Sequence, residues 1–69
     1  MRQDEMLKEM DILLIMNDGK TFEYLDYKYK IKNGKLYWHS EIFNSWYIDD
    51  LCYWEYGNLR DVMNFLMED

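Results

Sequence analysis

The chain has 69 residues, a net charge of −6, and three Trp, seven Tyr and three Phe. Its single cysteine, Cys52, excludes an internal disulfide, and its single histidine, His39, offers no Cys/His spacing for a structural zinc site. A domain this small buries only about 60% of its unfolded surface and cannot enclose every ring, and exposed rings among carboxylates are typical of a partner-binding surface.

We expect one domain over residues 1–69, because the sequence has no linker, repeat or low-complexity stretch. The first eleven residues carry four acids and lack the apolar segment of a signal peptide. The longest apolar run, residues 12–16, is too short to span a membrane. The absence of Ala and Pro is typical of an A/T-rich genome, such as that of a low-GC bacterium or its virus. With one cysteine, these features predict a protein of the bacterial host cytoplasm that has no membrane partner.

The first predicted element is a helix over residues 4–17, with Gly19 near its C-terminal cap. Its apolar stripe consists of Met6, Leu7, Met10, Leu13 and Leu14. Three further apolar residues, Ile12, Ile15 and Met16, lie off this stripe. A strand over residues 12–16 that enters a hairpin is therefore the alternative, although the helix is favoured.

A short strand over residues 21–25 and then a β-hairpin follow the helix. Asn33-Gly34 stands between two alternating segments and is the preferred sequence of a type I′ turn. The two-residue loop fixes the register, so that Lys32 faces Lys35 and Tyr29 faces Trp38. One face of the hairpin then carries Tyr27, Tyr29, Ile31, Leu36 and Trp38, and the other carries Lys28, Lys30, Lys32, Lys35, Tyr37 and His39.

A third hairpin strand is predicted over residues 46–51, after a turn over residues 41–44. A C-terminal helix is predicted to start at Asn58 as N-cap, with Asp61 at its third position. Its apolar stripe is Leu59, Val62, Met63 and Leu66. The predicted fold is α+β: a small antiparallel meander of three or four strands, flanked by an N-terminal and a C-terminal helix.

The sequence shows no catalytic constellation. Cys52 has apolar neighbours, which predicts a packed core cysteine rather than a nucleophile. Asp49 and Asp50 are adjacent, and adjacent strand residues point to opposite faces. The three glycines are isolated, so no phosphate-binding loop is present. We therefore expect a protein that is not an enzyme and that carries no metal or cofactor.

The C-terminal part of the chain combines acids with aromatic residues. Residues 41–69 contain seven acids and one arginine. Trp and Tyr dominate interface hot spots, because they bury a large area at low entropic cost. Trp46 is expected to face inward. The predicted partner-binding residues are Asp49, Asp50, Tyr53, Trp54, Glu55, Tyr56 and Asp61.

The basic face of the hairpin is the one candidate anion site, formed by Lys28, Lys30, Lys32 and His39. A solvated strand face offset by the protein's own acids is the simpler interpretation. The net charge of −6 opposes direct binding of nucleic acid, because phosphate would meet a repulsive field.

A helix, then Asp18-Gly19-Lys20, a short meander and a closing helix resembles small anti-defence proteins of bacteriophages. Among these are anti-CRISPR inhibitors and a Thoeris anti-defence family that sequesters a cyclic nucleotide. In the sequestering family a basic residue and a Trp follow Gly-Lys, whereas Thr21-Phe22-Glu23-Tyr24 follow here. No ligand residue is therefore carried over.

The resemblance and the acidic aromatic segment together predict a phage-encoded inhibitor of a host nucleic-acid-binding defence protein, such as a CRISPR effector. Its acids would mimic phosphates, and its rings would anchor the contact. One alternative is an oligomeric sponge for a nucleotide signal, with Lys28, Lys30 and His39 at a subunit junction. Another is an antitoxin-like or structural interaction module. The small core also predicts a homodimer that shares Ile12, Ile15 and Met16 between subunits.

Overall fold

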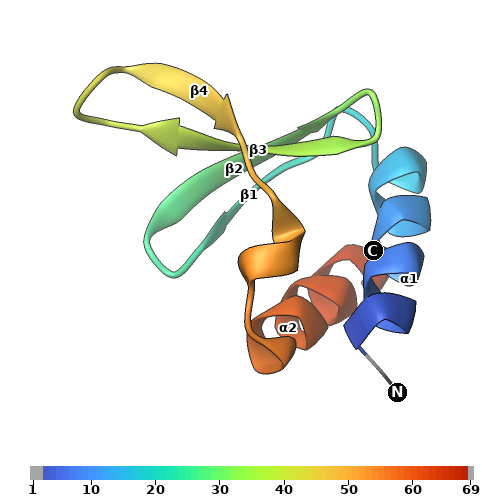
Figure 1. The fold of residues 1–69 in the computed structure, drawn as a ribbon. Coiled ribbons are helices and arrows are strands. Elements are labelled where there is room, and N and C mark those ends of the chain that lie inside the picture. The colour runs from blue at the N-terminus through green and yellow to red at the C-terminus, as the bar shows by residue number, and fades with distance from the viewer. Residues whose placement is uncertain (1–2, 69) are drawn as a thin grey trace.

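The computed structural model describes residues 3–68 and confirms the predicted α+β fold (Figure 1). Four strands form one antiparallel meander in the order β1-β2-β3-β4. The segment over residues 12–16 belongs to the first helix, so the strand alternative is excluded. The elements in chain order are α1 (Gln3–Met16), β1 (Thr21–Tyr24), β2 (Tyr27–Lys32), β3 (Lys35–Ser40), β4 (Ser45–Ile48), the 3-10 helix η1 (Leu51–Tyr53) and α2 (Tyr56–Met67).

The register of the central hairpin is the predicted one. Lys32 pairs with Lys35, and Tyr29 pairs with Trp38. Asn33 and Gly34 have φ values of 55° and 74°, as a type I′ turn requires. The Asn33 backbone N–H also donates to Asp18 Oδ1 at 2.7 Å, which ties the turn to the end of α1.

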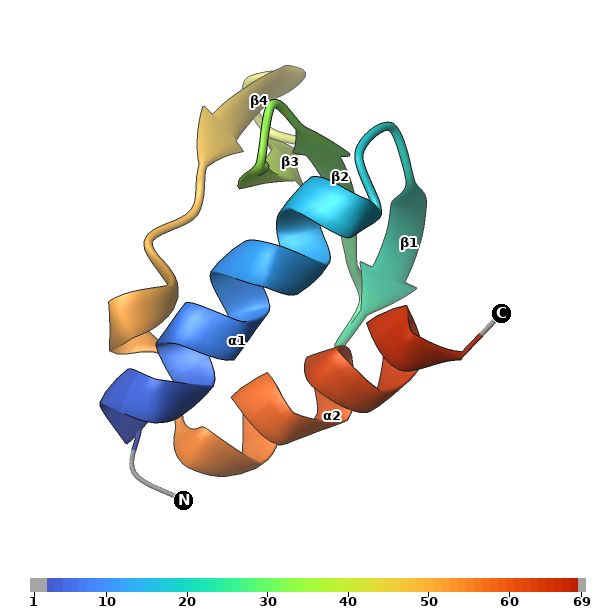
Figure 2. The ribbon, with the colours of Figure 1, turned by 90° about the vertical axis from the view of Figure 1, so that its right-hand side faces the viewer.

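The two helices lie side by side and cover one part of the sheet, while the turns β1–β2 and β3–β4 extend beyond them (Figures 1 and 2). Both predicted helical stripes face the core. The stripe of α2 is fully buried, and Leu7 and Leu13 at the margin of the α1 stripe are partly buried. The core consists of Met6, Met10, Leu14, Phe22, Tyr29, Ile31, Leu36, Leu51, Leu59, Val62, Met63 and Leu66.

Two predicted boundaries are wrong. Strand β4 ends at Ile48, because the chain turns into η1, where the Asp50 side chain accepts the Cys52 backbone N–H at 3.1 Å. Helix α2 starts at Tyr56 rather than after Asn58, and the Leu59 N–H already donates to the Glu55 carbonyl at 3.0 Å. Asn58 therefore lies in the first turn of α2 and is not its N-cap.

Two predicted burials are also wrong. The turn over residues 41–44 sets the register of β4 so that Trp46 pairs with His39 and Tyr47 with Trp38. Paired residues share a face of the sheet, so Trp46 lies on the basic face and is 38% exposed. Cys52 is exposed, because η1 directs it away from the core.

Candidate functional site

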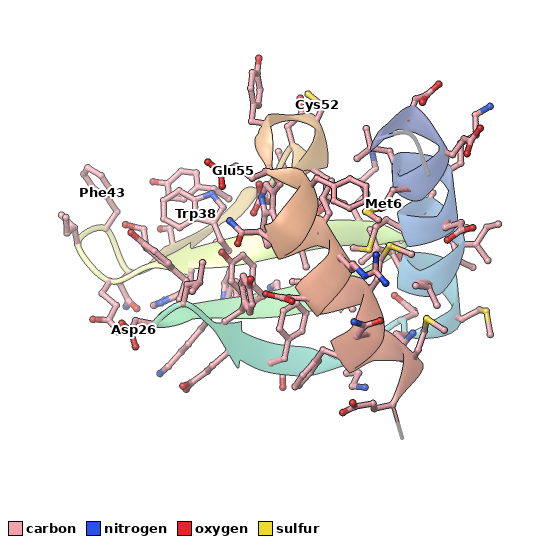
Figure 3. The ribbon with its side chains drawn as sticks, turned by 90° about the horizontal axis from the view of Figure 1, so that it is seen from below. Met6, Asp26, Trp38, Phe43, Cys52 and Glu55 are labelled. Carbon is pink, nitrogen blue, oxygen red and sulfur yellow. The ribbon has the colours of Figure 1, made fainter. Side chains whose placement is uncertain are left out.

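The part of the sheet that the helices leave uncovered exposes aromatic and aliphatic side chains. We call it the open half; it comprises Tyr27, Trp38, Tyr47 and the turn residues 25–26 and 41–44. Figure 3 shows Trp38 on the helix side of the sheet, with Asp26 and Phe43 at the tips of the two hairpins. Phe43 is 70% exposed and Ile42 is 89% exposed. Exposed apolar surface of this kind makes the open half a candidate binding region.

The rings of the open half contact one another in sequence across three strands. Tyr27 and Trp38 have centroids 6.3 Å apart and planes at 88°. Trp38 and Tyr47 follow at 5.4 Å and 33°. These spacings are those of favourable aromatic pairs, so each ring limits the motion of the next.

Three hollows border these rings, and Tyr27 lines all of them. The largest, 660 Å³, lies between the two hairpin tips and reaches Phe43. The second, 330 Å³, lies between β1, β2 and the segment that leads into α2, and Trp54 lines it. The smallest, 230 Å³, is formed by Tyr27, Tyr29, Trp38 and Asp49. We refer to the three together as the aromatic groove.

Carboxylates outnumber basic groups around the aromatic groove. Each hollow has at least one acid in its lining, and the basic residues Lys28 and His39 border the largest one. The four acids are Asp26, Glu41, Asp49 and Glu55. The groove therefore combines apolar surface with an excess of negative charge, which favours contact with positively charged groups.

Asp49 is the acid held most firmly. Its two oxygens accept the Trp54 Nε1–H at 3.1 and 3.2 Å. Burial raises the pKa of Asp49, the bond from Trp54 opposes this effect, and the neighbouring Asp50 adds to it. Burial, followed by the charge of Asp49, also raises the pKa of Tyr29 to about 12. The carboxylate therefore stands in a partly desolvated site beside aromatic rings.

Other hydrogen bonds fix the second hollow. The Tyr24 hydroxyl lies 3.1 Å from Asn58 Oδ1 and 3.0 Å from Asp61 Oδ2, and it has one proton to donate to them. The Tyr24 ring stacks on Trp54, with centroids 5.9 Å apart. Burial and then the Asp61 carboxylate raise the pKa of Tyr24. Strand β1, the segment before α2 and α2 itself are thus joined at this hollow.

The predicted partner-binding residues are divided by the structure. Asp49, Tyr53, Trp54 and Glu55 line the groove. Asp61 contributes through its bond to Tyr24. The other two lie apart: Asp50 caps η1, and Tyr56 does not border the three hollows.

The sequence prediction missed Tyr27, Trp38 and Asp26 as site residues. Alternation along the hairpin placed Tyr27 and Trp38 on one face with Tyr29, Ile31 and Leu36, and neither ring was predicted to bind a partner. The missing information was how far the helices reach along that face. A turn residue such as Asp26 gives no signal of its own, because its position depends on the packing of distant elements.

Of the four predicted anion-binding residues, Lys30 and Lys32 lie on the opposite face, whereas Lys28 and His39 also line the largest hollow beside Asp26 and Glu41. Lys30 Nζ stands 4.6 Å from the Trp46 ring centroid, and the His39 ring is 4.9 Å from it. Lys28 pairs with Glu23 across the strands, and Lys32 pairs with Lys35. Internal rings therefore engage Lys30 and His39 of this basic cluster.

Within residues 3–68, no group of three His, Cys, Asp or Glu side chains is arranged to hold a metal ion. Interaction with Asp50 raises the pKa of the Cys52 thiol, which disfavours a reactive thiolate. Neither helix in the described part of the chain has the length and apolar character needed to cross a membrane.

Comparisons with protein-family models, with curated proteins and with solved structures each gave no match. The aromatic groove, with its rings and carboxylates, is therefore the basis for a functional argument. Its chemistry is that of non-covalent recognition, since aromatic faces and carboxylates both attract cations.

Proposed function

We propose that this chain is a non-enzymatic binding protein whose aromatic groove holds a basic segment of a partner protein. The observation that carries the proposal is the open half of the sheet, where exposed rings are bordered by Asp26, Glu41, Asp49 and Glu55. Burying apolar surface contributes about 25 cal/mol per Å², so covering these rings is favourable. The carboxylates then select a partner of positive charge.

The proposed partner is a host nucleic-acid-binding protein, with a defence protein such as a CRISPR effector as the leading example, and the proposed place of action is the bacterial cytoplasm. Proteins that bind nucleic acid present Lys and Arg to phosphates. A domain with a net charge of −6 is attracted to such a surface and competes with the phosphates for it. Inhibition follows from occupancy and needs no catalytic group.

A nucleotide sponge is a less favoured second candidate. It would use Lys28, Lys30 and His39, but Lys30 already lies over Trp46, and Lys28 stands opposite Glu23 in the strand register, where the carboxylate opposes an anionic phosphate. An antitoxin-like module would use the same groove, since it also binds a protein. The identity of the partner separates it from an inhibitor of a defence protein.

The test is a pull-down from a low-GC bacterial lysate, followed by association rates with the captured partner at two salt concentrations. One variant neutralises three groove acids: Asp26→Asn, Glu41→Gln and Glu55→Gln. A matched control neutralises three exposed acids of α1: Asp4→Asn, Glu5→Gln and Glu9→Gln. Both variants change the net charge equally, and only their positions differ.

We expect the groove variant to associate more slowly and with a flatter salt dependence than the control. Association rates respond to charge near the contact, and salt screens charges beyond the Debye length of about 8 Å at physiological ionic strength. Equal effects of the two variants would show that net charge alone acts and would remove the groove from the proposal. A partner without a basic surface would contradict the proposal as well.

A further inference from the structure

The smallest hollow of the aromatic groove is a corner built from three rings and one carboxylate. Tyr27 and Trp38 stand at 88° to each other and form two walls. The buried Tyr29 and the carboxylate of Asp49 complete the lining. The volume is 230 Å³, which is below the range of about 300–1,000 Å³ for typical small-molecule sites and is suited to one side chain.

This combination of groups favours a cation. Aromatic faces attract a positive charge that lies within about 6 Å of the ring centroid. A carboxylate has about four lone-pair positions, and Asp49 shares the single Nε1–H of Trp54 between its two oxygens. Acceptor capacity therefore remains on Asp49 for a donor that enters the corner.

A bound cation would also offset the unfavourable partial burial of the Asp49 carboxylate. Burial raises the pKa of Asp49, which means that its charged form is less stable in the folded chain than in water. A positive group in direct contact restores part of the lost solvation.

The opposite face of the sheet supplies an internal comparison. There Lys30 Nζ lies 4.6 Å from the centroid of Trp46 and 5.8 Å from that of Tyr37. The chain's own cation thus fills a position between two rings. Within residues 3–68, the lysines that lie over rings are Lys20 and Lys30, and neither is over Tyr27 or Trp38.

We propose that the corner formed by Tyr27, Tyr29, Trp38 and Asp49 binds the guanidinium group of an arginine side chain. The inference rests on the proposed function, because the arginine belongs to the basic segment of the partner. Arginine fits better than lysine for two reasons. Its planar group stacks on an aromatic wall, and its fork of N–H donors matches a carboxylate.

The experiment titrates the full chain, labelled with ¹⁵N, with the blocked peptide Gly-Gly-Arg-Gly-Gly and follows the indole N–H signals. The three tryptophans provide a built-in control. Trp38 and Trp54 adjoin Asp49, whereas Trp46 lies on the opposite face. Two further peptides replace arginine by lysine or by citrulline, which keeps the planar shape and removes the charge.

We expect the arginine peptide to shift the Trp38 and Trp54 signals at millimolar concentration, the range typical of one side-chain contact, and to leave Trp46 in place. The lysine peptide should bind more weakly, and the citrulline peptide should give no shift. Equal shifts with citrulline, equal shifts at Trp46, or no shift with arginine would each overturn the inference. A stronger response to lysine would assign the corner to an ammonium group instead.

Substitution of the carboxylate tests the geometry. Asp49→Asn keeps an acceptor for Trp54 and removes the charge, and it should weaken binding of the arginine peptide by about tenfold or more. Asp50→Asn is the matched control, since Asp50 caps η1 outside the corner, and it should bind like the native chain. An unchanged affinity of Asp49→Asn would exclude the proposed contact. Normal dispersion of the amide signals confirms that each variant is folded.

The two proposals can fail separately. If a basic partner depends on Asp26, Glu41 and Glu55 but the arginine peptide does not bind, the inference is wrong and the proposed function stands. If the peptide binds through Asp49 but the captured partner is not basic, the corner recognises arginine and the proposed function is wrong.

Discussion

The covered and open halves of the sheet share the same strands and the same alternation, yet only one is a core. On strands β2 and β3, Tyr29, Ile31 and Leu36 are buried beneath the helices. A few residues along the same face, Tyr27 is 54% exposed and Trp38 is only partly buried. The two halves differ in whether the helices α1 and α2 cover them, and not in the alternation of their strand sequences. Alternation shows which face is apolar, and the reach of the helices decides how much of it is core.

The two halves also differ in the kind of apolar residue. Aliphatic side chains dominate the buried part, whereas the open half carries rings and places acids at its border. Rings with polar atoms tolerate water and provide large contact area at low entropic cost. This distribution of rings and acids is the one expected if the open half contacts a partner, as proposed above.

The largest expected effect is on stability and separates the two halves directly. Leu59→Ala removes a fully buried side chain and should cost about 2–5 kcal/mol of unfolding free energy. Phe43→Ala, at the exposed tip of the open half, should change it by no more than about 0.5 kcal/mol. Urea unfolding of the two variants measures both. A comparable loss in Phe43→Ala would show that the open half belongs to the core.

A smaller loss is expected where the covered half meets the central turn. Gly34 has a φ of 74°, and a Cβ there would lie 3.0 Å from Ile15 Cγ1 of α1. Gly34→Val should therefore cost about 1–3 kcal/mol, through backbone strain and contact with the helix. Gly57→Ala is the matched control, because it lies in α2 and a Cβ meets no atom within 4 Å. If thermal unfolding shows no difference between the variants, the strained turn does not contribute to the covered half.

The sequence allowed the fold to be predicted because its signals are local. Asn33-Gly34 fixed the register, and helical spacing identified the buried residues of both helices. The failures came from non-local effects. Trp46 faces outward because the preceding turn sets its register, and Cys52 is exposed because η1 replaces the end of a predicted strand. The groove depends on how far the helices cover the sheet, so Tyr27 and Trp38 were not predicted as site residues. The acids at the hairpin tips, Asp26 and Glu41, gave no signal in the sequence.

The outer side of α1 is a second exposed apolar surface, distinct from the open half of the sheet. Ile12 is 58% exposed and Met16 is 74% exposed on α1, away from the groove. We expect a homodimer through this helix at about 100 μM, measured by sedimentation, and Ile12→Gln should weaken it by about tenfold, or about 1.4 kcal/mol. Phe43→Ser should leave it intact. Loss of the dimer with Phe43→Ser alone would mean that the open half pairs with itself.

A monomer under these conditions would remove the predicted dimer and leave the groove proposal unaffected. The distinction matters because a dimer through α1 keeps both grooves accessible. A dimer through the open half would instead compete with a partner, and the association rate would fall as the protein concentration rises.

The smallest effect concerns two adjacent carboxylates with opposite pH dependence. Burial raises the pKa of Asp49 at the groove, whereas interaction with the Cys52 thiol and backbone N–H lowers that of Asp50 at the cap of η1. A raised pKa means that the folded chain holds the proton more tightly. Stability from Asp49 is therefore present at low pH and is lost as the pH rises from about 4, the ordinary value for Asp. For Asp50 the sign is reversed, and its contribution is lost as the pH falls below that value.

Substitution by Asn removes each titration in turn. Relative to the native chain, Asp49→Asn should gain stability between about pH 4 and pH 7, and Asp50→Asn should lose it over the same range. Urea unfolding at several pH values measures the two differences. If both stability differences change with pH in the same direction, folding does not disfavour the charged form of Asp49. Opposite pH dependences would show that the charged form of Asp49 destabilises the fold while that of the adjacent Asp50 stabilises it. A destabilising charge at the groove is expected if the groove is a binding site, because binding sites often trade stability for function.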